Sequence, residues 1–266
     1  MIRAVQHNIK AFMDDPDADK ANPIHSTHVA KAYGFRGALV GGATAYGWVA
    51  RTIIDALGAN WLDEGWAHLK FVRPIYPGDD LTATVDEAGV LRVASQDEVC
   101  FLGEVGLGFA PWFEELLPNE FCAGASRPAT LPQLTLDNAP VGGPLRPMAV
   151  SMTASDAETF ALARERETHP AFLAPNARLH TAWIAEQLIH LLHHSYDYGP
   201  SIHAQSHIQH LHPVCADQTF VVTGICKEAY ERKANHYIVN DGAIWSESGD
   251  ELVRIRHTSV FRIRKS

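Results

Sequence analysis

Residues 68–85 have the sequence "HLKFVRPIYPGDDLTATV", and residues 207–224 have the sequence "HIQHLHPVCADQTFVVTG". Both segments alternate apolar and polar residues, break at a proline and continue as a second alternating run. Alternation with a period of two is typical of a β-strand with one buried face, and a proline marks an interruption in such a strand. Pro213 lies 139 positions after Pro74. The sequence therefore predicts a strand, a bulge and a strand twice, at a fixed offset.

The same offset relates two helix candidates, residues 43–57 and 182–196. Small and apolar residues recur at helical spacing in both segments: Ala43, Gly47, Ala50, Ile54 and Leu57 in the first, and Ala182, Ala185, Leu188, Ile189 and Leu192 in the second. Each half of the chain is thus predicted to hold one long helix followed by antiparallel strands, an α+β class. Residues 118–147 are rich in Pro, Gly, Ala and Asn and indicate a linker. We expect an N-terminal domain over 1–117 and a C-terminal domain over 148–266.

The composition limits the class of protein. The chain has 266 residues, 46% hydrophobic and 20% charged, with a net charge of −9, which favours neither nucleic acid nor an anionic membrane as a partner. The longest charge-free run near the first helix, residues 37–50, is too short to span a bilayer, and the N-terminus has no apolar signal segment. The four cysteines lie far apart, which favours reduced thiols over a zinc site. We expect a cytoplasmic protein without a metal or another cofactor.

The segment "DKANPIHSTHVAKAYGFRGALVGGATAYG" (residues 19–47) holds the candidate functional residues. Pro23 has a fixed φ and biases Asn22 towards an extended conformation, so the side chains of Asn22 and His25 take defined directions. A histidine exchanges protons near neutral pH. Gly41 and Gly42 precede the first long helix and would let another group approach the N–H donors at its start. The alternatives are an Asn-Pro turn with an exposed His25, and glycines that only let the helix pack closely.

This segment and "FVRPIYPGDDL" (residues 71–81) resemble the MaoC-like dehydratases, the (R)-specific enoyl-CoA hydratase group of the hot-dog fold. The resemblance implies an antiparallel sheet wrapped around one long central helix. Two such units in one chain form a tandem, or double, hot-dog fold, which agrees with the repeat at 139 residues.

The resemblance also implies roles for single residues. His25 would be the acid/base, Asn22 would hold a water molecule or the loop, and the N–H of Gly42 would bind the thioester oxygen. Gly41 would then contact the substrate, as would Tyr46 on the helix and His180, which occupies the place of Gly41 in the second half.

One position departs from the family pattern. The family has an aspartate where this chain has Lys20, although Asp19 lies next to it. A carboxylate can orient a water molecule and accept its proton, whereas an ammonium group cannot. Three interpretations remain open: Asp19 is recruited, the site binds an acyl group without hydrating it, or Lys20 is a solvated loop residue.

The leading hypothesis is a hydratase or dehydratase that acts reversibly on a 2-enoyl/3-hydroxyacyl thioester of coenzyme A or an acyl-carrier protein. The alternatives are an acyl-CoA thioesterase and a catalytically silent acyl-CoA-binding protein. We expect no nucleic-acid or membrane partner, and a homodimer of the tandem chain is possible.

The second half is expected to lack a competent site. At the 139-residue offset, the counterpart of residues 22–25 is "ALAR" (residues 161–164), which has no acid/base pair. The second half is rich in histidine, but on an ideal strand His203 and His207 face opposite to His210 and His212. This arrangement argues against a metal site.

Overall fold

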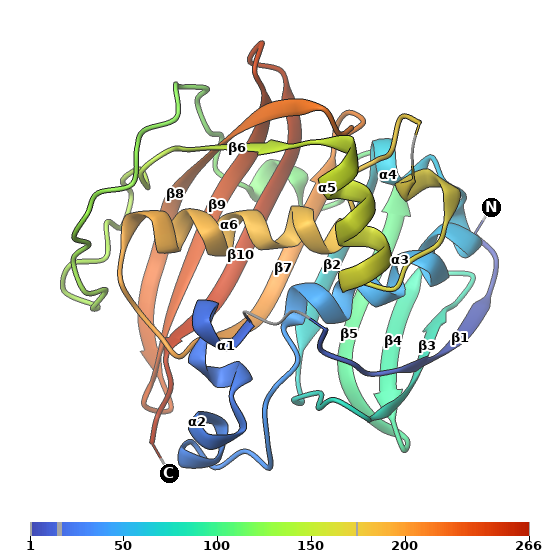
Figure 1. Cartoon of the computed structure of the whole chain (residues 1–266), viewed down its shortest axis with the longest axis horizontal. Coiled ribbons are helices and arrows are strands. Elements are labelled where there is room, and N and C mark those ends of the chain that lie inside the picture. The colour runs from blue at the N-terminus through green and yellow to red at the C-terminus, as the bar shows by residue number, and fades with distance from the viewer. Residues whose placement is uncertain (1, 15–17, 174, 266) are drawn as a thin grey trace.

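The computed structural model describes residues 2–14, 18–173 and 175–265. Within these residues, ten strands form one sheet of antiparallel neighbours in the order β1-β3-β4-β5-β2-β7-β10-β9-β8-β6 (Figure 1). The strands of the first half are β1 (Val5–Lys10), β2 (Gly65–Phe71), β3 (Asp80–Val85), β4 (Val90–Ser95) and β5 (Glu98–Leu107). Those of the second half are β6 (Met148–Met152), β7 (Ile202–His210), β8 (Gln218–Arg232), β9 (Asn235–Ser246) and β10 (Glu251–Arg262).

Two long helices, α3 (Gly42–Leu57) and α6 (Thr181–Ser195), lie on one face of this sheet (Figure 1). Both begin and end within one residue of the predicted helices, because small and apolar residues at helical spacing give each helix a buried face. The shorter helices are α1 (Ala18–Ala21), α2 (Thr27–Ala32), α4 (Trp61–Glu64) and α5 (Ala154–Thr159). Single turns are η1 (Pro23–His25), η2 (Phe113–Glu115), η3 (Phe160–Arg164) and η4 (Pro170–Phe172).

The two halves join where β2 pairs with β7. Residues 66–70 of β2 lie antiparallel to residues 205–209 of β7, with His68 directly opposite His207. The helices meet on the same side of this joint, since Gly47 of α3 lies against Ala182 at the start of α6. One chain thus forms a continuous sheet with two central helices, which is the architecture expected for a tandem hot-dog fold.

The proline-marked breaks are not bulges, contrary to the sequence-based expectation. β2 and β3 are separated in the sheet by β5 and β4, so residues 72–79 connect one side of the first-half sheet to the other. Pro74 and Pro77 cannot donate ladder hydrogen bonds, and Gly78 turns the chain with a φ of +93°. Residues 211–217 make the corresponding connection between β7 and β8.

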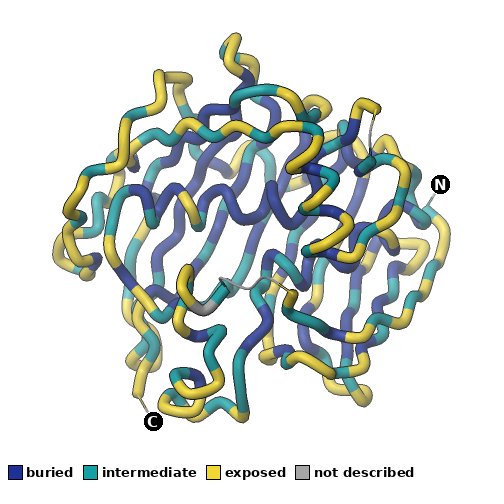
Figure 2. Tube along the Cα trace, in the orientation of Figure 1, coloured by how far each residue is buried: buried dark blue, intermediate teal, exposed yellow. Residues whose placement is uncertain are grey.

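The hydrophobic core fills the space between the sheet and the two long helices. Tyr46 and Ile53 of α3 are fully buried, as are Leu188 of α6 and the sheet residues Leu69 and Phe101. Figure 2 shows the long helices and the central strands as mostly buried and the outer loops as exposed. Among the described helices, none combines the length and apolar character needed to cross a membrane.

We expect Gly47→Val to lower the free energy of unfolding by about 1–3 kcal/mol, because overpacking a filled core forces its neighbours apart. A Cβ atom at Gly47 would lie 2.8 Å from both the Cβ of Ala182 and the Cε1 of His180. Urea unfolding measures the change. At Gly37 the same Cβ atom would meet only the Thr27 hydroxyl, at 4.0 Å, so Gly37→Val is the control and should change stability by less than about 0.5 kcal/mol. Equal stability of the two variants would contradict this packing.

Candidate active site

The side chain of Asn22 forms hydrogen bonds that connect the first half of the chain to the second. Its Oδ1 accepts from the N–H of Ile24 (3.4 Å) and from the N–H of Ser201 (3.1 Å). Its Nδ2 donates to the carbonyl oxygen of Ser201 (2.9 Å) and to the Ser201 hydroxyl (3.2 Å). The amide caps the turn η1 and also holds the start of β7. Asn22 is therefore a positioning residue for the loop, and these contacts already use both ends of its amide.

His25 ends the turn that Asn22 caps. Its Nδ1 lies 2.6 Å from the carbonyl oxygen of Leu39. A carbonyl only accepts, so Nδ1 carries the proton and donates it. The other edge of the ring faces the start of α3, where a Cβ atom at Gly41 would lie 3.6 Å from Cε1 and 3.9 Å from Nε2. The hydrogen bond to Leu39 thus fixes the orientation of the ring, with Nε2 on the edge that faces the helix entry.

The N-terminus of α3 adjoins His25. Gly41 is the N-cap residue, and within the described residues no side chain caps the first turn. The N–H of Val40 donates to the carbonyl oxygen of Ile75 (2.9 Å), which fixes the direction of the chain as it enters the helix. Amide donors at a helix N-terminus favour negative charge.

A cavity of about 450 Å³ lies at this point, and both halves line it. The first half contributes the turn that carries Asn22 and His25, the start of α3 and the end of β2. The second half contributes α6, the start of β7 and the end of β10. The segment with α1 and α2 extends beside the start of β7 (Figure 1). The described carboxylates in the lining are Asp14 and Glu186, which form ion pairs with Arg166 (2.5 Å) and Arg164 respectively.

A β-bulge brings a further histidine into the cavity wall. Gln205 pairs with Thr258 and His203 pairs with Ser259, so Ala204 is an extra residue in β7. The bulge reverses the alternation of side chains for the residue before it, so His203 faces the helices instead of the outer side of the sheet. A Cβ atom at Gly42 would lie 2.8 Å from the Cβ, Cγ and Nδ1 atoms of His203. The ideal-strand expectation for His203 is therefore wrong.

His203 and His257 form a buried pair in this wall, with ring centroids 4.2 Å apart. Burial lowers the pKa of His257 to about 3. Burial, and to a lesser degree His257, also hold the pKa of His203 well below its usual value. Both rings are therefore neutral near pH 7.

Other residues singled out in the sequence lie elsewhere. Tyr46 is fully buried and packs edge-on against Trp61, with ring centroids 6.4 Å apart. His180 caps α6, where its Nδ1 accepts from the N–H of Ala182 (3.3 Å). Neither is among the described residues that line the cavity. Lys20 is exposed on α1 and is also outside that lining, and the side chain of Asp19 lies outside what the structure describes.

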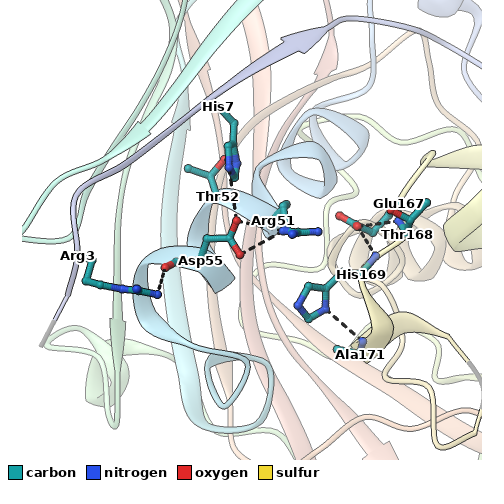
Figure 3. A network of polar contacts seen from close by, with 9 residues as sticks. All are labelled: Arg3, His7, Arg51, Thr52, Asp55, Glu167, Thr168, His169 and Ala171. Carbon is teal, nitrogen blue, oxygen red and sulfur yellow. Dashed lines mark hydrogen bonds and ion pairs between the residues drawn. The ribbon is translucent and has the colours of Figure 1, made fainter.

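The second half repeats the turn of residues 22–25, but at a different place from the one expected. In η4 the N–H of Ala171 donates to His169 Nδ1 (3.1 Å; Figure 3). The N–H of Ile24 donates to Asn22 Oδ1 in the same way in the first half. Phe172 then occupies the place of His25. Residues 161–164, the counterpart expected from the sequence, lie instead in η3, so that expectation is wrong. The connection from the turn to the helix is shorter in the second half, which shifts the offset.

Phe172 and His180 fill the place where the second half would otherwise have a site. Phe172 is fully buried, and its ring centroid lies 4.7 Å from that of His180. In the first half, the same two places hold His25 and Gly41. The described residues therefore provide a histidine facing an uncapped helix entry in the first half alone.

In the part of the chain that the structure describes, no three His, Cys, Asp or Glu side chains converge as metal ligands.

We expect the protein to lose stability in acid, because its buried neutral histidines bind protons only after unfolding. The pKa of His257 is about 3 in the folded chain and about 6.5 when unfolded. Its contribution is complete above pH 6.5 and is lost as the pH falls towards 3, by up to about 1.4 kcal/mol per pH unit. In urea unfolding between pH 7 and pH 5, His257→Gln should therefore show a weaker pH dependence than the wild type. His28→Gln, at an exposed position, is the control, and equal slopes for all three proteins would refute the assignment.

Comparisons with known proteins agree with this architecture. No protein-family model and no curated protein matches the sequence. Among solved structures, one from Chloroflexus aurantiacus, assigned as a MaoC domain protein dehydratase, is 12% identical with a TM-score of 0.64, over 99% of this chain and 96% of that chain. RV0216 from Mycobacterium tuberculosis, described as a double hotdog fold, is 12% identical with a TM-score of 0.63, over 98% and 96%.

A third structure, from Lactobacillus plantarum and assigned as an oleoyl thioesterase, is 10% identical with a TM-score of 0.51, over 99% of this chain and 98% of that chain. At these identities the likeness establishes the fold. The chain is therefore a double hot-dog protein, and the resemblance of its sequence to MaoC-like proteins is confirmed at the level of the fold.

Proposed function

We propose that this chain is a hydratase/dehydratase that acts reversibly on a 2-enoyl/3-hydroxyacyl thioester of coenzyme A. The observation that carries the proposal is the position of His25. Its Nδ1 is held by the Leu39 carbonyl, and its opposite edge faces Gly41 at an uncapped helix entry inside a cavity of about 450 Å³. A base beside a preorganised oxyanion site is what addition of water to an enoyl thioester requires.

The mechanism follows from these two groups. The thioester oxygen would accept from the N–H of Gly42, which draws electron density from the double bond. A water molecule would attack the β-carbon as His25 Nε2 takes its proton, and the enolate charge would develop on the oxygen at the helix N-terminus. Protonation of the α-carbon completes the hydration, and the reverse sequence is dehydration. Stabilisation of this oxygen is expected to be the larger effect, because the donors need no reorganisation.

The second half would complete the site without a catalytic turn of its own. Asn22 binds Ser201 and so fixes the distance between the His25 turn and the start of β7. We assign the residues before 118 to the catalytic domain, residues 118–147 to a linker, and residues 148–266 to the domain that walls the cavity. We expect one competent site per chain, because Phe172 occupies in the second half the position that His25 holds in the first.

Thioester hydrolysis is the second candidate, supported by the likeness in fold to the structure assigned as a thioesterase. The same cavity would then direct water at the carbonyl carbon. Against this, the described carboxylates in the lining, Asp14 and Glu186, are both held by arginines. A silent acyl-CoA-binding protein would show neither activity.

We expect the wild type to consume crotonyl-CoA, seen as loss of the enoyl absorbance, without thiol release. His25→Ala should lower the hydration rate by about 10²–10⁴-fold, because it removes the acid/base. His28→Ala is the matched control, since His28 is an exposed histidine in the next helix. Thiol release by the wild type would favour the thioesterase. A wild-type hydration rate in His25→Ala would show that His25 is not the acid/base.

We expect Lys20→Asp to raise the hydration rate or leave it unchanged. The substitution restores the carboxylate of the family pattern; position 20 is exposed and outside the described cavity lining, so the rate rises only if the new side chain turns inward to orient water and support a protonated His25. Lys31→Asp makes the same charge change on α2, at another exposed lysine, and should have no effect on the rate. Loss of activity in Lys20→Asp alone would show that Lys20 contacts the substrate.

A further inference from the structure

Four side chains form a continuous hydrogen-bonded chain in the wall of the cavity. His203 Nε2 lies 2.7 Å from Ser206 Oγ, which lies 3.2 Å from His257 Nδ1. His257 Nε2 in turn lies 2.8 Å from Ser259 Oγ. Ser206, His257 and Ser259 are 0%, 1% and 3% exposed. We refer to this set as the His203–Ser259 chain. The bulge at Ala204 assembles it, since His203 would otherwise face away from Ser206.

Both ends of the chain reach the cavity. His203, His257 and Ser259 are all in its lining. The Nδ1 atom of His203 is buried and has no hydrogen-bond partner among the described residues. It is directed at the helix entry, 2.8 Å from the place of a Cβ atom on Gly42. A buried imidazole nitrogen without a hydrogen-bond partner costs desolvation free energy, so we expect a bound ligand to interact with this atom.

We propose that His203 is a second acid–base group of this site, which protonates the substrate α-carbon from Nδ1 and is resupplied through the His203–Ser259 chain. This inference rests on the proposed hydratase function and assigns a catalytic residue to the second half. His25 lies at Gly41 and His203 at Gly42, so the two histidines flank the position assigned to the thioester oxygen.

The proton transfer balances along the chain. His203 Nδ1–H gives its proton to the α-carbon of the enolate, and the Ser206 hydroxyl gives its proton to His203 Nε2. His257 Nδ1–H resupplies Ser206, and the Ser259 hydroxyl gives its proton to His257 Nε2. Ser259 then takes a proton from His25 through water in the cavity, which restores the proton removed from the attacking water. At the end no group in the chain is charged, but His203 and His257 each hold their proton on the opposite nitrogen. A proton that enters from cavity water at His203 Nδ1, and one that leaves to cavity water from Ser259, return the chain to its starting tautomers before the next hydration.

Such a chain suits histidines that are neutral. A neutral imidazole is a poor acid unless its second nitrogen gains a proton in the same step, and Ser206 is placed to supply it. Burial keeps His203 and His257 neutral. The chain would therefore supply the proton for the α-carbon without a carboxylate.

The test is a set of variants assayed for hydration of crotonyl-CoA. His203→Gln keeps a polar group that can reach Ser206 but cannot transfer a proton between two nitrogens. We expect kcat to fall by about 10²-fold or more with KM changed less than about twofold. Ser206→Ala leaves His203 in place and breaks the chain, so it should lower kcat as well. The double variant should be no worse than His203→Gln alone, because both changes interrupt one pathway.

Chemical rescue separates catalysis from a structural role. His203→Ala opens a space in the cavity wall, and added imidazole should restore part of its kcat. His207→Ala is the control: His207 lies on the same strand but stacks on His68, with ring centroids 4.2 Å apart, and does not line the cavity. It should keep the wild-type kcat and show no response to imidazole.

The possible failures are distinct. If the wild type and the His25 variant both fail to hydrate, the proposed function is wrong and the inference falls with it. If the wild type hydrates and depends on His25, but Ser206→Ala and His203→Gln keep kcat within about threefold, His203 is not an acid–base group. A His203→Gln effect on KM alone, or a loss in His203→Ala that imidazole does not restore, would likewise overturn the proposal.

Discussion

The pairing of β2 with β7 is the interaction on which the candidate site depends. This ladder joins two half-sheets that would otherwise end in open edges, and it sets the start of β7 beside the end of β2. Ser201 can then bind Asn22, and His203 can reach Gly42. The cavity is therefore a property of the joined sheet and not of either half, because each half alone supplies one wall.

The two halves use the same turn for opposite purposes. In each, a polar side chain caps a turn begun by proline, and the carbonyl oxygen of the turn's middle residue accepts a hydrogen bond from the segment that enters a long helix. The first turn ends in His25 opposite a glycine, which leaves space for a ligand. The second ends in Phe172 opposite His180, and these rings fill the space. Two side-chain exchanges thus turn a potential second site into part of the core.

The sequence predicted the helices and the tandem architecture well, because each long helix carries small and apolar residues at a regular spacing. It located His25 and Gly41 because a proline and two glycines restrict the local backbone. It did not reveal His203, since one inserted residue at Ala204 reverses a strand face and nothing in the local sequence marks the bulge. The counterpart turn at His169 was misplaced for a related reason: a constant offset cannot follow a shortened loop. Strand order was missed because pairing joins residues far apart in the chain.

The electrostatics of the cavity explain how the site could operate without the carboxylate of the family pattern. The carboxylates described in its lining are paired with arginines, and burial keeps His203 and His257 neutral. A charge that develops on a bound thioester oxygen would then meet amide dipoles at the start of α3 in a low-dielectric space. Fixed dipoles in such surroundings interact with charge more strongly than in water, and they do not need to reorient during the reaction. A carboxylate beside that oxygen would repel the same charge, so an acid–base group that stays neutral has an electrostatic advantage there.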